Sequence, residues 1–342
     1  MSEDLEFDSE QEEELFEHHR FKADPGQEMI RIDKFLIDRL ANTSRNKIQI
    51  AAKNGNIYVN GKKVKQNYRV KPGDELAIVL PYPIREIKLI PQNIPIEIIY
   101  EDEDCLVVNK PSNMVVHPGY GNYSGTLINA LVYHIENLPK APKDYYGRPG
   151  LVHRIDKHTT GLLVVAKTEL ALTNLASQFF ERTTERRYYA LVWGDLEKDG
   201  TITGNIGRSL KNRKVMAVYP NEDHGKHAVT HFKVLERFGF LTLIECKLET
   251  GRTHQIRVHF QSIGHPLFND IEYGGNKILK GSTSASYVKF IQNCFELLPG
   301  QALHAKTLGF KHPTSKTFIR LESNLPTQFD VLLNQCRKYT SH

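Results

Sequence analysis

Short apolar runs of the β type, separated by polar turns, constrain the fold of this chain more than any other feature. They are IEIIYE (96–101), CLVVNKP (105–111), LLVVAKT (162–168), RYYALVWG (187–194), LTLIECKL (241–248) and HQIRVHF (254–260). Few stretches with helical spacing lie between them, notably 168–183 and the C-terminal 327–342. Many strands with few helices are typical of an α+β fold rather than a regular doubly wound sheet.

The composition is that of a soluble globular protein, with 40% hydrophobic and 25% charged residues. No stretch approaches the roughly 18 apolar residues of a membrane span, and no secretory signal opens the chain. The four cysteines are scattered and form no C-x-x-C pair, which argues against a disulfide framework or a cysteine zinc site. We expect a cytoplasmic protein without a membrane partner, and monomer is the default state.

The charge is unevenly distributed along the chain. Residues 1–28 hold 11 of the 40 acidic and 2 of the 45 basic side chains, so this head carries −9 and the remainder +14. A body this basic suits a polyanion such as nucleic acid, although a lysine-rich solvated surface would look the same. The head is interpreted as an acidic, disordered or weakly helical tail.

Proline punctuation divides the rest of the chain. Pro81, Pro83, Pro91 and Pro95 fall between two regions of regular patterning, and proline disfavours both helix and central strand. We therefore expect a small basic module at 29–82, a linker at 83–95 and a large body at 96–342. The sequence contains no internal repeat of 20–50 residues.

The small module predicts two helices followed by a basic hairpin. Ile32, Phe35, Leu36 and Leu40 have helical spacing, Thr43 or Ser44 can cap a second helix, and Asn60-Gly61 suits a tight turn. The pattern RIDKFL, SRNKIQ, GNIYVNG and VKPGDEL resembles the RNA-binding domain of ribosomal protein S-four. The helix start and hairpin offer sites for RNA phosphates. The candidate RNA-binding residues here are Arg45, Lys47, Lys53, Lys62 and Lys63.

The run 150–167, GLVHRIDKHTTGLLVVAK, is the most informative in the chain. A polar segment bounded by glycines precedes a strand of the buried type, and catalytic groups are often held on loops at the ends of such rigid elements. Arg154 lies two residues before Asp156, and the hydroxyls of Thr159 and Thr160 follow. Taken alone, these residues favour a structural Asp–Arg pair in a turn over an oriented, ionised catalytic carboxylate.

Four ordered segments resemble the RluA/RluD family of pseudouridine synthases. They are 109–118 (K-P-x-G-x-x-V-H-P in the family), 153–161 (H-R-L-D-x-x-T-S-G), 187–192, and 251–259 followed by 264–266. Ile155 replaces the family's Leu, Thr160 its Ser, and Asn113 its Gly. Asn tolerates a positive φ, so that turn can survive. With the S-four-like module, the resemblance covers nearly all of residues 29–325.

The resemblance implies a body with a mixed, largely antiparallel sheet and a cofactor-independent isomerisation of uridine to pseudouridine. Asp156 would be the catalytic carboxylate and Arg257 its ion-pair partner. Tyr188 would stack on the base and could assist proton transfer at C5. Arg154 would fill the gap left by the flipped nucleotide or hold that nucleotide. No cofactor and no metal are implied, and the His224, His227 and His231 spacing has no zinc signature.

Structured RNA is the expected partner, with large-subunit ribosomal RNA favoured by analogy. A basic loop at 207–216 adds Arg208, Arg213 and Lys214 as candidate phosphate contacts. Two alternatives stay open. One is a pseudouridine synthase that acts on tRNA, and the other is a catalytically idle RNA-binding protein that aids ribosome assembly. The presence of Asp156, Tyr188 and Arg257 together argues against the idle protein.

Overall fold

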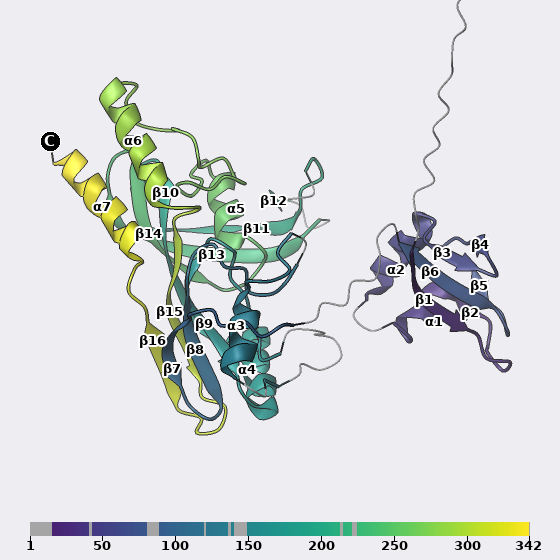
Figure 1. The fold of residues 1–342 in the computed structure, drawn as a ribbon. Helices are drawn as coiled ribbons and strands as arrows, with labels where there is room; N and C mark the ends of the chain where they lie inside the picture. The colour runs from purple at the N-terminus through teal and green to yellow at the C-terminus, as the bar shows by residue number, and fades with distance from the viewer. Residues whose placement is uncertain are drawn as a thin grey trace, which may run out of the picture. The chain divides into compact units, whose positions relative to one another are not determined.

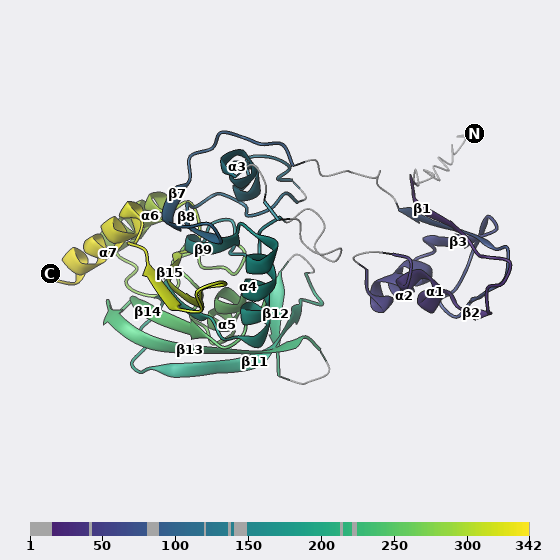
Figure 2. The ribbon, with the colours of Figure 1, turned by 90° about the horizontal axis from the view of Figure 1, so that it is seen from below.

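The computed structural model describes residues 16–40, 43–80, 89–119, 121–135, 138–139, 149–212, 215–220 and 224–341. Within these ranges the chain forms two compact units. One holds the described residues up to Leu80 and the other those from Leu89 onward. Figures 1 and 2 show both units, and each has its own hydrophobic core.

The N-terminal unit combines two short helices with two small sheets. Its elements are β1 (Phe16–Lys22), β2 (Ile30–Arg31), α1 (Ile32–Ile37), α2 (Arg45–Lys53), β3 (Ile57–Val59), β4 (Lys62–Lys63), β5 (Arg69–Val70) and β6 (Glu75–Leu80). One sheet has the order β1-β6-β3-β4, and β2 pairs with β5. Phe35, Ile48 and Ile57 are buried in the core between helices and sheet.

Local sequence signals account for the helix–hairpin part of this unit. The hydroxyl of Ser44 accepts the backbone N–H of Lys47 at 3.3 Å and so caps α2. Asn60 and Gly61 adopt φ values of 50° and 75° in the turn between β3 and β4, as the sequence predicts for a tight hairpin.

The assignment of residues 1–28 to a disordered tail is wrong for residues 16–22. These residues form β1, an edge strand that pairs antiparallel with β6. Phe21 packs against the core of this unit, and the exposed Glu17 alternates with inward-facing neighbours. The average charge of the segment concealed this alternation, which is the pattern of a half-buried strand. Residues 1–15 lie outside the described residues.

The larger unit is built on one extended sheet with helices packed against it (Figure 1). Its strands are β7 (Glu97–Glu101), β8 (Cys105–Lys110), β9 (Thr160–Ala166), β10 (Glu185–Trp193), β11 (Gly200–Arg208), β12 (Met216–Tyr219), β13 (Lys226–Arg237), β14 (Leu241–Leu248), β15 (Leu303–Lys311) and β16 (Phe318–Glu322). Its helices are α3 (Leu127–His134), α4 (Glu169–Glu181), α5 (Gln255–Ser262), α6 (Ala285–Leu297) and α7 (Thr327–Thr340). None of the described helices combines the length and apolarity that crossing a bilayer requires.

The sheet has ten strands in the order β12-β11-β13-β14-β10-β15-β9-β8-β7, with β16 paired to β15. All of these pairings are antiparallel except that of β9 with β15. The expected α+β fold with a mixed, largely antiparallel sheet is therefore confirmed. The single parallel pair matters for the site, because β9 directly follows the Asp156 segment.

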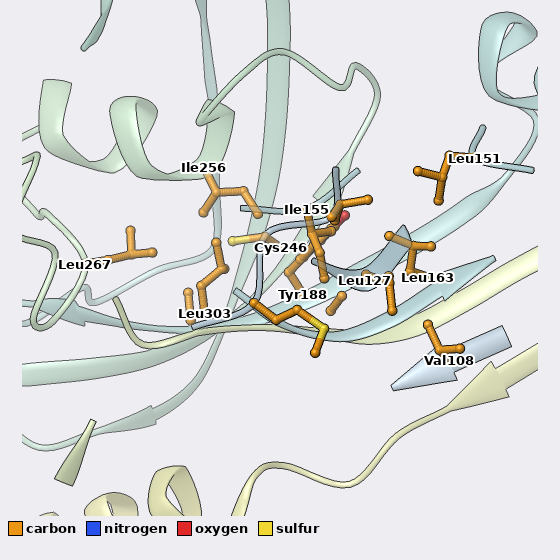
Figure 3. Close-up of a cluster of buried hydrophobic side chains, with 14 of the residues drawn as sticks. Val108, Leu127, Leu151, Ile155, Leu163, Tyr188, Cys246, Ile256, Leu267 and Leu303 are labelled. Atoms are coloured by element: carbon orange, nitrogen blue, oxygen red, sulfur yellow. The ribbon is translucent and has the colours of Figure 1, made fainter. Parts of the chain in front are cut away.

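Successive side chains along a central strand pack into different hydrophobic clusters. On β9, Leu163 and Val165 join the main cluster with α3 and α5, whereas Leu162 and Val164 join the cluster with α4. Figure 3 shows part of the main cluster, in which Ile155 and Tyr188 lie together. The segment that carries Asp156 is thus anchored directly on the main core.

The strand predicted for residues 254–260 is wrong, because this segment forms α5. The letters HQIRVHF alternate apolar and polar residues, which favours a strand in isolation. In the structure every residue from Gln255 to Phe260 is buried, including Arg257 and His259. The helix is thus buried on its apolar and polar positions alike, which the local pattern does not signal, and the helical conformation determines where Arg257 points.

Candidate active site

Asp156 lies in the loop that leads into β9. The loop begins after Leu151, which forms a β-bridge with Val165. The backbone carbonyl of Asp156 closes a turn by accepting the backbone N–H of Thr159 at 3.1 Å. Its neighbour Ile155 is buried in the main core, whereas the Asp156 side chain stays 19% exposed. Burial of one residue and exposure of the next fix the direction of the carboxylate.

Residues on both flanks of Asp156 tie the loop to its surroundings. The ring of His153 accepts the Val164 backbone N–H at 3.0 Å and stacks on Phe179. Beyond Asp156, the hydroxyl of Ser112 donates to the carbonyl of His158 at 3.2 Å. Such contacts on both flanks hold the backbone at Asp156 in place, as a preorganised site requires.

Lys110 ties the first motif to the Asp156 loop. Its ammonium is almost fully buried and donates to the carbonyls of Pro111 (2.7 Å), Met114 (2.8 Å) and Lys157 (3.1 Å). Burial lowers the pKa of Lys110 to about 7, although the charge of Asp156 raises it. The three carbonyl acceptors also favour the charged form. We assign Lys110 a structural part in holding the loop.

The two threonines of the motif are also bonded. Thr159 Oγ1 accepts from the amide of Gln301 at 3.2 Å, and Thr160 Oγ1 lies 2.8 Å from His304 Nδ1. On the far side of that ring, Nε2 lies 2.9 Å from the hydroxyl of Ser323. A hydroxyl is therefore needed at position 160, and Thr supplies it as well as Ser would.

Arg257 reaches Asp156 from α5. Its Nη1 donates to Asp156 Oδ2 at 3.0 Å across 101 residues of sequence. The other nitrogens are also occupied: Nε and Nη2 donate to Asp270 at 2.7 and 2.8 Å, and Nη2 donates to Glu272 at 2.6 Å. Burial alone would lower the pKa of Arg257, but the hydrogen bonds and charges of these carboxylates raise it well above its ordinary value. The guanidinium is thus a fixed positive charge.

His254 lies on the other side of the Asp156 carboxylate. Its Nε2 is 3.8 Å from Asp156 Oδ1, and its Nδ1 is 2.9 Å from the hydroxyl of Tyr273. His254 is the residue immediately before α5, so the helix that delivers Arg257 also delivers this ring.

Tyr188 lies on β10, in a row of registered neighbours that crosses four strands. Tyr188 pairs with Ala305, Ala305 with Gly161, and Gly161 with Lys110. This row runs past the start of β9, directly after the Asp156 loop. Burial raises the pKa of Tyr188; the charge of Arg186 lowers it in part, and that of Asp156 raises it. The side chain is only 8% exposed and belongs to the main hydrophobic cluster.

Arg154 differs from the rest of the motif. It is exposed, and among the described residues its side chain has no hydrogen-bond or ion-pair partner. The structure therefore brings Asp156, Arg257 and Tyr188 to one place and leaves Arg154 next to them, directed to solvent.

The candidate RNA-binding residues are placed as follows. Arg45, Lys47 and Lys53 lie on α2, and exposed Lys62 and Lys63 form β4 of the N-terminal unit. In the larger unit, Arg208 ends β11, and Arg213 and Lys214 lie outside the described residues.

The guanidinium of Arg45 forms an ion pair within its own unit. Its Nε donates to the fully buried Asp33 at 2.9 Å. Burial alone would raise the pKa of Asp33, but hydrogen bonds from Gln49, Arg31 and Arg45 hold it well below its ordinary value. Arg45 therefore has a structural role in joining α1 to α2.

Sequence reasoning missed Asp270 and Glu272, which complete the coordination of Arg257. They follow the third motif in the segment FNDIEYGG, where no regular element signals their direction. The burial of Arg257 was not predicted from the sequence, so nothing there called for more than one carboxylate partner.

Two family models match the chain. One, described as RNA pseudouridylate synthase, matches residues 104–262. The other, described as the S4 domain, matches residues 30–76. Among solved structures, the human RNA pseudouridylate synthase domain containing 4 superposes with a TM-score of 0.53 at 24% identity, covering 70% of this chain and 93% of that chain. This likeness concerns the fold.

Curated relatives match over nearly the full length. The chain is 45% identical over 312 residues to an uncharacterized RNA pseudouridine synthase of Chlorobaculum parvum, which covers 90% of this chain and 94% of that protein. It is 44% identical over 317 residues to an uncharacterized RNA pseudouridine synthase of Bacillus subtilis, and the match covers 92% of this chain and 97% of that protein. It is 42% identical over 308 residues to the ribosomal large subunit pseudouridine synthase D of Nitrosomonas europaea, covering 90% and 85%. The chain therefore belongs to the RNA pseudouridine synthase family.

Proposed function

We propose that this protein isomerises specific uridines to pseudouridine in structured RNA, with large-subunit ribosomal RNA as the substrate, and that Asp156 is the reacting carboxylate. The observation that carries the proposal is the ion pair of Asp156 with Arg257. Arg257 is itself locked by buried Asp270, so it holds one oxygen of a partly exposed carboxylate in a fixed position. Such an oriented group is suited to act on a ribose placed above it.

The reaction is balanced without any further reactant. The C1′–N1 glycosidic bond breaks, a C1′–C5 bond forms, C5 loses its proton and N1 gains one. Two routes need the same ionised Asp156: attack on the sugar at C1′, or removal of a ribose proton. No electron acceptor, phosphate donor or cofactor enters either route.

Tyr188 and Arg154 complete the proposed site. Because its pKa is raised, Tyr188 keeps its proton at neutral pH, and it therefore acts as an apolar ring and hydroxyl donor toward the detached base rather than as a base. Arg154 is exposed beside Asp156, so it can enter the space that the uridine leaves when it flips out of its stack.

The choice of RNA rests on the N-terminal unit and on the relatives. The S4 domain places the exposed Lys62 and Lys63 on a hairpin, where cations can contact phosphates. Relatives with about 40% identity are named ribosomal large subunit pseudouridine synthase D. A tRNA substrate is the alternative within the same chemistry, and an idle assembly factor would not need the intact Asp156–Arg257 pair.

Tritium release tests the activity with purified components. Transcripts carrying [5-³H]uridine are prepared for large-subunit ribosomal RNA segments and for tRNAs, and each is incubated with the full chain. Isomerisation replaces the C5–H bond, so tritium should appear in water from ribosomal segments. Release from tRNA alone would support the alternative substrate. No release from any of the RNAs, despite binding, would support the idle protein.

A further inference from the structure

His254 has a strained backbone at the point where it enters the site. It adopts φ 55° and ψ 25°, the left-handed conformation, immediately before α5. Positive φ is uncommon in non-glycine residues, and such strain gathers where the surrounding structure enforces a particular position. Here the strain places the imidazole between two carboxylates, with Nε2 3.8 Å from Asp156 Oδ1 and Nδ1 3.8 Å from Glu272 Oε2.

The hydrogen bonds of Tyr273 are consistent with one tautomer of His254, in which the proton is on Nε2. The phenol oxygen accepts the backbone N–H of Met216 at 3.0 Å. That N–H can only donate, so the phenol is free to give its own proton to His254 Nδ1, 2.9 Å away. Burial raises the pKa of Tyr273 to about 12, which keeps this proton in place. This donation would make His254 Nδ1 the acceptor and leave the hydrogen of the neutral ring on Nε2.

The charges around the ring are consistent with a neutral imidazole. Burial lowers the pKa of His254, and the positive charge of Arg257 acts in the same direction. The charges of Asp156, Glu272 and Asp270 raise it only in part. The Nε2–H group that faces Asp156 is thus a neutral donor and not half of a permanent ion pair.

We propose that His254 is a positioning residue for Asp156, whose Nε2–H holds carboxylate oxygen Oδ1 while Arg257 holds Oδ2. This inference rests on the proposed role of Asp156. A separation of 3.8 Å is longer than a hydrogen bond. Catalytic hydrogen bonds are often long in the free enzyme and shorten when substrate binds. The contact between His254 and Asp156 closes in this way when RNA fills the site.

A second donor changes what the carboxylate can do. A carboxylate held at one oxygen can still rotate about its Cβ–Cγ bond, so its lone pairs sweep over an arc. Donors on both oxygens fix the plane of the group. Attack on C1′ and removal of a ribose proton each require a defined lone-pair direction, so fixing the plane raises the rate of the chemical step more than it raises affinity.

Two substitutions at this position form a matched pair. His254→Asn keeps a residue that tolerates positive φ and a polar atom near the place of Nδ1, but it removes the donor at Nε2. His254→Gln can place its amide NH₂ near the position of Nε2. In single-turnover tritium release, the Asn variant should lose roughly 10- to 100-fold in the rate of the chemical step, with the Kd for the RNA transcript, measured by titration, little changed. The Gln variant should recover at least part of that loss. Equal rates for both variants, or a wild-type rate for Asn, would overturn the proposal.

The tautomer gives a readout that does not depend on activity. In ¹⁵N NMR of the full chain at pH 7, His254 should show the pattern of a ring protonated at Nε2. In Tyr273→Phe, which lacks the phenol proton, it should become a mixture of tautomers. A ring protonated at Nδ1, or an imidazolium in the wild type, contradicts the inference even if a His254 variant fails to fold.

Failure of the inference can be told apart from failure of the proposed function. Asp156→Asn is run in the same assay. If Asp156→Asn is inactive and His254→Asn is fully active, only the role of His254 is lost. If Asp156→Asn is fully active, the proposed role of Asp156 fails, and the role of His254 fails with it.

Discussion

Arg257 and Asp270 form a bidentate ion pair inside the larger unit, with Nε and Nη2 of the arginine 2.7 and 2.8 Å from the two carboxylate oxygens. Asp270 is fully buried and the Arg257 side chain is 5% exposed. Only Nη1 then remains for Asp156. The buried pair thus determines the orientation of the arginine before any RNA arrives.

Removing Asp270 should damage both stability and activity. Asp270→Ala leaves a buried guanidinium without its main partner, which costs about 3 kcal/mol in the free energy of unfolding. Without Asp270, Arg257 should also no longer hold Asp156 in a fixed position, so turnover should fall by more than tenfold. Urea denaturation and tritium release measure the two effects.

The matched control is the exposed pair of Asp195 with Arg237. Asp195→Ala should cost about 1 kcal/mol or less, because exposed ion pairs contribute little. Equal losses for the two variants would mean that burial of the Arg257–Asp270 pair has no special energetic effect.

Gly161 of the central motif is required by the approach of β15. A Cβ atom on Gly161 would lie 2.3 Å from the carbonyl oxygen of Ala305, and its φ is +107°. Gly161→Ala should therefore cost about 2–5 kcal/mol through clash and backbone strain. It should also lower activity by shifting the start of β9. Gly119→Ala has open space and no positive φ, so thermal and urea unfolding should find it within about 1 kcal/mol of wild type.

Buried histidines should make the protein sensitive to acid. Burial lowers the pKa of His259 to about 4 from the ordinary 6.5. Between these values the unfolded chain binds a proton that the folded chain does not, so stability is complete above pH 6.5 and falls as pH falls toward 4. The loss from this group is about 1.4 kcal/mol per pH unit at most.

Urea titrations at pH 7, 6 and 5 test this prediction. His259→Gln should reduce the pH slope of the unfolding free energy by about one bound proton. An unchanged slope would show that His259 does not contribute in this way, whatever the variant does to stability at pH 7.

The lysines of β4 should act through RNA phosphates. Lys62 and Lys63 are both exposed. Replacing both with Gln should weaken RNA binding most at low salt and reduce the slope of log affinity against log salt by up to about 2. Fluorescence titrations at several salt concentrations measure this slope. If the double substitution leaves this slope unchanged, Lys62 and Lys63 do not contact RNA phosphates.

The sequence was most informative where chemistry and local geometry coincide. Ser44, Asn60 and Gly61 were interpretable because a helix cap and a hairpin turn need only local bonds. Asn113 adopts φ 62° in its turn. This confirms that Asn can replace the family's Gly there, because Asn tolerates a positive φ. The Asp156–Arg257 contact was expected from the family resemblance, since no local rule joins residues 101 positions apart.

The parts that sequence reasoning missed depend on tertiary contacts. Residues 254–260 alternate like a strand, yet residues 255–260 form a helix whose apolar and polar side chains are all buried. Glu272 approaches Arg257 from a segment without regular structure. The pattern of β1 was hidden by the acidic composition around it. In each case the deciding interaction comes from a residue that lies elsewhere in the sequence.

Pseudouridine mapping across total RNA of a cell lacking this protein tests the central claim most directly. The cell is complemented with the wild type or with Asp156→Asn, an isosteric change that removes the charge facing Arg257. We predict that specific uridines of large-subunit ribosomal RNA lose modification in the deletion and that only the wild type restores them. Full restoration by Asp156→Asn, with both proteins present at equal levels, would contradict the account.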